Sequence, residues 1–67
     1  MKATYSISMM VGTNGLGTII HETLVNVEMA DAIAKLKELA TEWAGQIIRW
    51  DVYEDGCTIA SSRWAKA

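Results

Sequence analysis

Apolar and polar side chains alternate along the N-terminal segment, from about Ala3 to Val11. A period of two predicts a β-strand with one face toward a core and one face toward water. A second, β-branched run from about Thr18 to Val25 is separated from the first by Asn14-Gly15. Asn-Gly between two such runs is a strong signal for a β-hairpin with a two-residue turn. The apolar positions of the first strand are Tyr5, Ile7, Met9 and Val11.

The turn length decides which residues of the first hairpin face each other. With a two-residue turn at Asn14-Gly15, Tyr5 lies opposite Leu24 and Met9 lies opposite Ile20. A longer loop would shift the register by one residue and turn the second strand over, because side chains alternate between the two faces of a strand.

The middle of the chain has the spacing of one amphipathic helix. Asn26 is the candidate N-cap, acidic residues follow in the first turn, and Gly45 marks the end. Apolar positions three and four residues apart predict a single buried stripe, with charged residues on the opposite side. The stripe consists of Met29, Ile33, Leu36, Ala40 and Trp43, flanked by Ala32 and Leu39.

A second hairpin is predicted around Asp55-Gly56, between strands from about Gln46 to Tyr53 and from Cys57 to Trp64. A two-residue turn pairs Val52 with Ile59 and Trp50 with Ser61, and a glycine bulge is the alternative. Hairpin, helix and hairpin together predict one α+β domain over residues 1–67, with a two-layer ββαββ architecture. The expected sheet is four-stranded and antiparallel, in the order 2-1-3-4, with the helix packed on one face.

The outer face of the second hairpin is the predicted partner-binding surface. A solvated strand face has no intrinsic need for aromatic side chains, and aromatic residues beside arginine are the types that dominate protein–protein interfaces. The alternative interpretations are a minor core and a platform on which single-stranded bases stack. The predicted partner-binding residues are Ile47, Arg49, Tyr53 and Trp64.

Composition and charge argue against several classes of protein. Six basic residues against eight acidic ones give a net charge of −2, which disfavours direct nucleic-acid binding. No apolar run has the length of a signal peptide or of a membrane span, and a single cysteine excludes an internal disulfide. These features predict a cytoplasmic location with no membrane association. A chain of 67 residues gains little stability from its core, so dense packing or a homodimer is expected to support it.

No constellation of residues predicts catalysis, a cofactor or a metal site. His21 and Glu22 are adjacent in a strand and therefore point to opposite faces. Cys57 has no histidine near it in sequence and is interpreted as a half-buried structural thiol. The glycines at 12, 15 and 17 precede a β-branched run rather than a helix, unlike a phosphate-binding loop.

The layout resembles that of small phage and mobile-element proteins of the anti-CRISPR type. The chain opens with Met1-Lys2-Ala3 and a strand, has one central helix, and ends in the hairpin segment DGCTIASSRW, residues 55–64. The resemblance implies a phage-encoded inhibitor that binds a larger host complex, such as a CRISPR effector, in the bacterial cytoplasm. The low net charge departs from strongly acidic inhibitors that imitate DNA.

The sequence therefore predicts a non-enzymatic protein-binding module, most specifically an inhibitor of a bacterial defence complex. The first alternative is a small homodimeric structural or regulatory protein that associates through an exposed sheet edge. The second alternative is a single-stranded nucleic-acid-binding domain.

Overall fold

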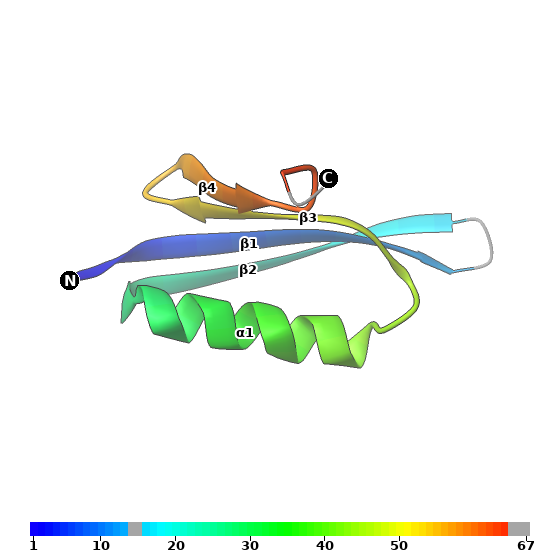
Figure 1. The fold of residues 1–67 in the computed structure, drawn as a ribbon, viewed down its shortest axis with the longest axis horizontal. Coiled ribbons are helices and arrows are strands. Elements are labelled where there is room, and N and C mark those ends of the chain that lie inside the picture. Colours follow the sequence, from blue (N-terminus) through cyan, green and yellow to red (C-terminus); the bar gives the residue numbers. More distant parts are fainter. Residues whose placement is uncertain (14–15, 65–67) are drawn as a thin grey trace.

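The computed structural model describes residues 1–13 and 16–64. The elements are β1 (Lys2–Thr13), β2 (Leu16–Glu28), α1 (Met29–Glu42), β3 (Ile47–Glu54) and β4 (Cys57–Ser61). The four strands form one antiparallel sheet in the order β2-β1-β3-β4, and α1 lies on one face of it (Figure 1). The predicted α+β architecture and strand order are confirmed. We call the face that carries α1 the inner face and the opposite one the outer face.

The first hairpin has the predicted register over most of its length. Tyr5 pairs with Leu24 and Met9 with Ile20, whereas the turn at Asn14-Gly15 lies outside the described residues. Near the helix the register shifts, and Ala3 pairs with Val27. Asn26 has a φ of 59° and is part of this bulge. Asparagine tolerates the left-handed region better than most residues, which explains its place there.

The predicted N-cap at Asn26 is therefore wrong, because β2 continues to Glu28. Glu28 caps the helix instead. Its backbone N–H donates to Asp31 Oδ2 at 3.1 Å, and the two residues form a reciprocal capping box. The helix ends at Glu42, and Gly45 follows with a φ of 83°.

The second hairpin has the predicted turn and a different register beyond it. Asp55 and Gly56 have φ values of 48° and 88°, as in a type I′ turn, and Glu54 pairs with Cys57. Ile59 is an extra residue in β4, so Val52 pairs with Ala60 and Asp51 pairs with Ser61. The predicted pairs Val52–Ile59 and Trp50–Ser61 are wrong for this reason.

Another bulge reverses the faces at the start of β3. Met10 pairs with Arg49 and Val11 pairs with Ile47, which leaves Ile48 unpaired. Ile47 packs against the core on the inner face, whereas Ile48 is 59% exposed. The prediction that Ile47 lies on the outer face is therefore wrong.

The core lies between β1, β3 and the sheet-facing side of α1. Its buried members are Ile7, Met9, Val11, Leu39 and Val52. Tyr5 and Ala32 are also buried, and the partly buried side chains packed against the cluster include Leu36, Trp43 and Trp50. The central strand β1 thus supplies three of the five buried cluster residues, as its alternating pattern predicts.

Tyr5 provides a pH-dependent contribution to stability. Its hydroxyl donates a hydrogen bond to Glu54 Oε2 at 3.0 Å. Burial, the hydrogen bond to Glu54 and neighbouring carboxylates raise the pKa of Tyr5 above its usual value of 10.0. The native state therefore favours the protonated phenol. The contribution is complete below pH 10 and is lost as the pH rises above that value.

We expect Tyr5→Phe to remove this alkaline component. At neutral pH the variant should be less stable, because the hydrogen bond to Glu54 is lost. Between neutral and strongly alkaline pH its melting temperature should fall less than that of the wild type, as followed by circular dichroism. Equal falls in the two proteins would contradict this role for Tyr5. Tyr53→Phe is the matched control, since Tyr53 lies on the outer face away from Glu54.

Candidate protein-binding groove

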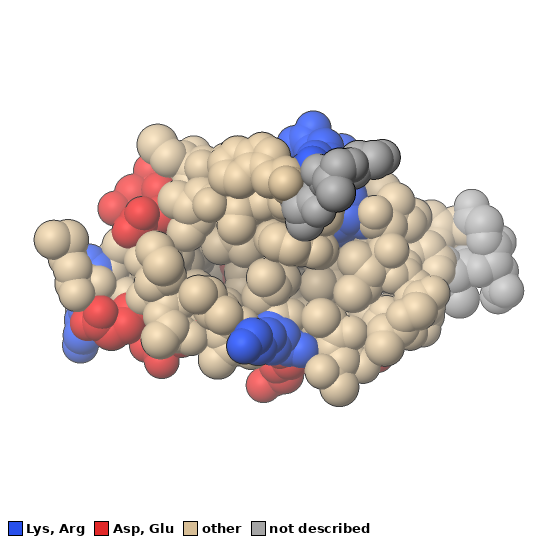
Figure 2. Space-filling view, viewed as in Figure 1, with Lys and Arg blue, Asp and Glu red and all other residues tan. Residues whose placement is uncertain are grey.

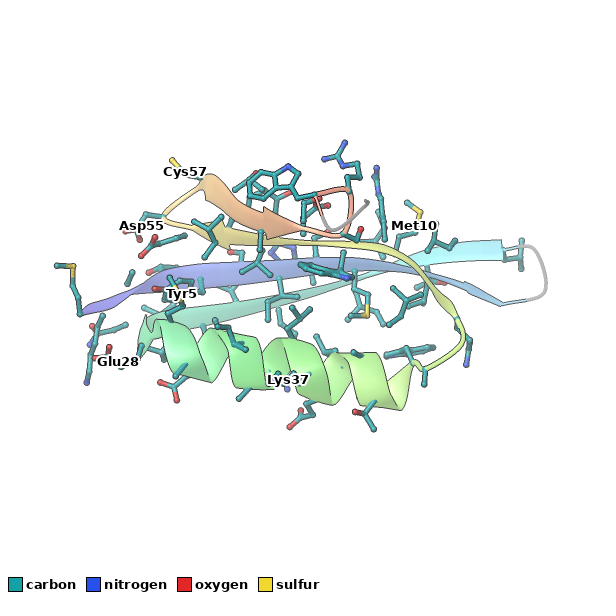
Figure 3. All side chains as sticks on the ribbon, viewed as in Figure 1. Tyr5, Met10, Glu28, Lys37, Asp55 and Cys57 are labelled. Atoms are coloured by element: carbon teal, nitrogen blue, oxygen red, sulfur yellow. The ribbon has the colours of Figure 1, made fainter. Side chains whose placement is uncertain are left out.

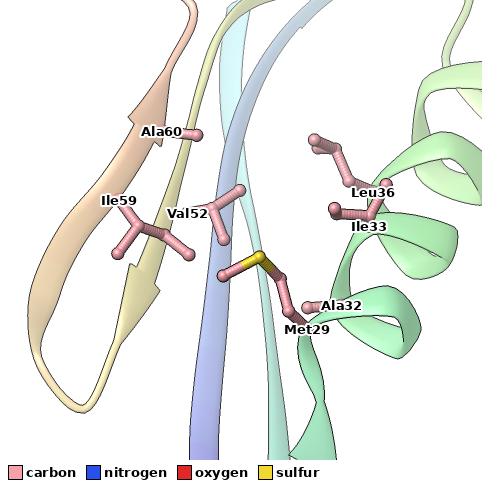
Figure 4. A pocket seen from close by; sticks show the side chains of 7 residues that line it. All are labelled: Met29, Ala32, Ile33, Leu36, Val52, Ile59 and Ala60. Carbon is pink, nitrogen blue, oxygen red and sulfur yellow. The ribbon is translucent and has the colours of Figure 1, made fainter.

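The helix covers only part of the inner face and leaves a groove beside it. α1 packs against β1 and β2. An apolar pocket of about 140 Å³ lies between it and β3 and β4 (Figure 4). Every side chain that lines the pocket is apolar. The lining residues are Met29, Ala32, Ile33, Leu36, Val52, Ile59 and Ala60.

The helix wall of the groove is formed by residues that the sequence assigned to the core. Met29 and Ile33 remain 44% and 45% exposed, whereas Ala32 and Leu39 are buried against the sheet. At about 100° per residue, Met29 and Ile33 are rotated from that buried line toward β3 and β4. The predicted stripe is thus only partly buried, and its remainder faces the groove.

The opposite side of α1 is charged. Lys35 Nζ donates to Glu38 Oε1 at 2.8 Å, and this hydrogen bond is the main cause of the raised pKa of Lys35. The carboxylate of Glu22, on the inner face of β2, adds to the same effect. Ionic contacts therefore satisfy the helix on its β2 side, and apolar side chains are left open on its β3–β4 side.

The floor of the groove depends on the bulge in β4. Because the extra residue interrupts strict alternation, Ile59 and Ala60 both pack toward the core instead of pointing to opposite faces. Val52, which pairs with Ala60, completes the floor. A regular hairpin would have turned one of these two side chains to the outer face.

Charged residues lie around the rim of the groove rather than in it. Lys37 projects from the front of α1, and the middle of the same face is without charge (Figures 2 and 3). At the hairpin end, Cys57 pairs with Glu54 and is exposed. The expectation of a half-buried thiol is therefore wrong.

The residues predicted to bind a partner do not all come together. Arg49 is exposed on the outer face, and Tyr53, four residues further along β3, is half-buried on the same face. Trp64 is 63% exposed but lies in the turn after β4, which ends at Ser61. Ile47 packs against the core on the inner face, so the predicted cluster with Trp64 does not form.

A polar row crosses the middle of the outer face. His21, Ser8, Asp51 and Ser61 are successive cross-strand neighbours on β2, β1, β3 and β4. A nucleophilic triad needs the histidine between the serine and the carboxylate. Here Ser8 on β1 lies between His21 on β2 and Asp51 on β3, so the histidine and the carboxylate are two strand spacings apart, about 10 Å. The row therefore does not have the order of a catalytic triad.

Asp51 is the most buried charged residue of this row. Its Oδ1 atom has no hydrogen-bond partner among the described residues, and the nearest cation is Arg63 Nη2 at 3.6 Å. The backbone N–H of Arg63 donates to Ser61 Oγ, which fixes the start of the C-terminal turn beside the carboxylate. The turn that carries Trp64 is held by backbone hydrogen bonds, because the N–H of Ser62 donates to Trp50 O at 2.9 Å and that of Trp64 to Ser61 O at 3.0 Å.

The described part of the chain contains no group of three or more His, Cys, Asp or Glu side chains able to hold a metal ion. Within the same residues, no helix is long and apolar enough to cross a membrane.

The fold and the groove define a two-layer ββαββ domain in which one helix covers half of a four-stranded sheet. No protein-family model matches the chain, and no curated protein or solved structure shows significant similarity to it. Any functional conclusion therefore depends on the geometry of the molecule itself.

Proposed function

We propose that this protein is a non-enzymatic protein-binding module whose contact surface is the groove between α1 and β3–β4. The observation that carries the proposal is the partial exposure of Met29 and Ile33 on the wall of an all-apolar pocket. Large apolar side chains gathered on one face, with charges at the edge, are characteristic of interaction surfaces. The chemistry of the groove fits an apolar helical segment, because helices bind such grooves through side chains spaced three or four residues apart.

The outer face is the second candidate for contact with a partner. Arg49 and Trp64 are exposed there or next to it, and at one end of the face Ile19, opposite Met10, is 61% exposed, whereas the middle of the face carries Ser6, Ser8 and Asp51. A polar strand face is well solvated without a partner. The groove differs from the outer face in being a concave pocket lined only by apolar side chains, and we therefore rank it first.

Site-specific photo-crosslinking tests the proposal. A photoreactive phenylalanine derivative at position 33 would report on the groove, and the same residue at position 49 would report on the outer face. In a lysate of the cell that produces the protein, we expect position 33 to give discrete cross-linked bands and position 49 to give fewer. Mass spectrometry would then identify the captured protein.

Circular dichroism would first establish that both labelled proteins are folded. Cross-links from position 49 with none from position 33 would move the binding surface to the outer face, and the double variant Arg49→Ala/Tyr53→Ala would then abolish capture. Cross-links from neither position would contradict a protein-binding role for both faces. The narrower interpretation, an inhibitor of a bacterial defence complex, stays a prediction from chain layout and size.

A further inference from the structure

We infer that one end of the outer face is a second docking surface, for a segment of another protein in which carboxylates stand next to apolar side chains. We call this surface the basic end of the outer face. It consists of Met10, Ile19, Ile48, Arg49 and Arg63. Since it lies on the opposite face of the sheet from the groove, the inference goes beyond the proposed function and does not depend on it.

The apolar part of the basic end begins as a row across three strands. Ile19 on β2 lies opposite Met10 on β1, and Met10 lies opposite Arg49 on β3, so the three side chains are neighbours on one face. Met10 points to the side of the sheet away from α1 (Figure 3). A single exposed apolar side chain is common, whereas a contiguous group of them marks a contact surface.

Two glycines provide space beside this row. Gly12 and Gly17 form the next cross-strand pair on the outer face and leave it without side chains of their own. A Cβ atom at Gly12 would lie 2.9 Å from Ile48 Cδ1, so the exposed side chain of Ile48 lies over Gly12. A Cβ atom at Gly17 would have no neighbour within 4 Å. An apolar side chain of a partner therefore has room over Gly17, next to Ile48.

Two guanidinium groups border the apolar part. Arg49 and Arg63 are both exposed, and neither side chain donates a hydrogen bond within the described residues. Arg63 Nη2 is 3.6 Å from Asp51 Oδ1, which is too far for a hydrogen bond. Arg49 is two residues from Asp51 on the same face of β3, about 7 Å away. One buried carboxylate thus stands beside two guanidinium groups, which leaves a net positive charge and unused donors.

No other acidic residue lies near the basic end, and all eight acidic residues belong to the described part of the chain. Glu54 pairs with Tyr5, five residues along β1 from Met10, or about 17 Å. Glu22 is on the inner face, and the remaining acidic residues lie on α1, at its N-cap or in the β3–β4 turn. Figure 2 shows acidic groups at the end with that turn, whereas basic groups lie beside the C-terminal turn. The carboxylates that complement the two arginines therefore have to come from another molecule.

A protein segment fits this surface better than a nucleic acid or a membrane does. A carboxylate accepts two parallel hydrogen bonds from one guanidinium group, and arginine and methionine are enriched where proteins meet. Nucleic acids and anionic membranes are held by larger clusters of basic side chains. This chain has six basic residues in all and a net charge of −2. Phosphates alone would also leave the apolar side chains beside the arginines without a contact.

An NMR titration of the isotope-labelled full chain tests the inference. The probe is a short acetylated peptide in which pairs of glutamates alternate with single leucines. We expect the backbone amide signals of Met10, Ile19 and Arg49 to shift on titration. The shifts should decrease as salt is added, because the contacts of the arginines are exposed. Peptides with lysine in place of glutamate, or with serine in place of leucine, should give no comparable shifts.

Substitutions of exposed residues separate local contacts from net charge. Arg49→Glu should weaken peptide binding at least about tenfold, because it removes charge-assisted hydrogen bonds and adds repulsion. Lys2→Glu makes the same charge change at an exposed residue at the far end of β1 and should bind as the wild type does. Ile48→Ser should weaken binding severalfold, whereas Val25→Ser, at an exposed position elsewhere on β2, should not. Circular dichroism establishes that all four variants are folded.

No shifts with any peptide, or shifts confined to the groove, overturn the inference. Equal weakening by Arg49→Glu and Lys2→Glu also overturns it, since only the net charge would then be sensed. Binding of single-stranded DNA or of phosphatidylserine vesicles, without a response to the peptide, would assign the arginines to phosphate and overturn it as well. The proposed function is tested separately, by capture at position 33, so the two can fail independently.

Discussion

Replacing Ile7 with alanine is expected to unfold a large fraction of the protein at ambient temperature. The side chain of Ile7 is completely buried at the centre of the sheet, between Glu22 of β2 and Val52 of β3. Removing three carbons from such a position costs about 2–5 kcal/mol, from lost burial and from the cavity that remains. A domain of this size has a comparable total stability, on the order of 5 kcal/mol.

Urea denaturation followed by tryptophan fluorescence measures this effect. Ile19→Ala is the matched control, since Ile19 lies on β2, 61% exposed, and should change the free energy of unfolding by well under about 1 kcal/mol. Similar midpoints for the two variants would mean that β1 does not form the centre of the core. In a dimeric protein both midpoints rise with concentration, so the comparison requires equal concentrations.

Gly56→Val is expected to have the second largest effect. Gly56 has a φ of 88°, in a region that β-branched residues avoid, although the space around its Cα is open. Forcing an L-residue into this region costs roughly 2 kcal/mol, and a β-branched side chain is among the least tolerant. The turn also holds the hairpin to β1, because the backbone N–H of Asp55 donates to Thr4 O at 2.8 Å.

The melting temperature of Gly56→Val should therefore fall by several degrees. Gly17→Val is the control, since Gly17 has open space around it, lacks a positive φ and lies in β2, where a β-branched residue is favourable. The control should melt at or above the wild-type temperature. A fall of equal size in both variants would attribute the effect to valine itself and not to the conformation at position 56.

Both variants also affect the groove, by different routes. Ile7 supports Val52, a floor residue, through the pairing of β1 and β3. The Asp55-Gly56 turn holds β4 in place, and β4 supplies Ile59 and Ala60. A weakened binding surface is therefore expected in each, and binding measurements on these variants have to be corrected for the unfolded fraction.

Local features were well predicted because local forces decide them. The alternation around Ile7 gives a strand with one buried face, and the helical spacing after Glu28 gives one helix. Asp55-Gly56 forms a turn that few other dipeptides favour, so the register next to it follows directly. A helix between two hairpins leaves few antiparallel arrangements, and the predicted strand order is the observed one.

The bulges were not predictable in this way. Ile48 and Ile59 are β-branched residues that fit any strand, and neither is a glycine that would mark an irregularity. Each bulge is stabilised by distant contacts, since it allows Ile47 or Ala60 to pack toward the core. Every side chain beyond a bulge changes face, which is why Ile47 was assigned to the outer face and the groove floor was not anticipated.

The sequence by itself determined the elements, their order, the Asp55-Gly56 turn and the small net charge, because each depends on neighbouring residues or on composition. Only the tertiary structure decided which part of the helical stripe is core. The stripe from Met29 to Trp43 is wider than one contact with a sheet can bury. With α1 seated over β1 and β2, Leu39 is buried and Ile33 is left beside an open half-sheet. Where a helix rests on its sheet depends on the packing of all the strands together, and the pattern along the helix does not contain that information.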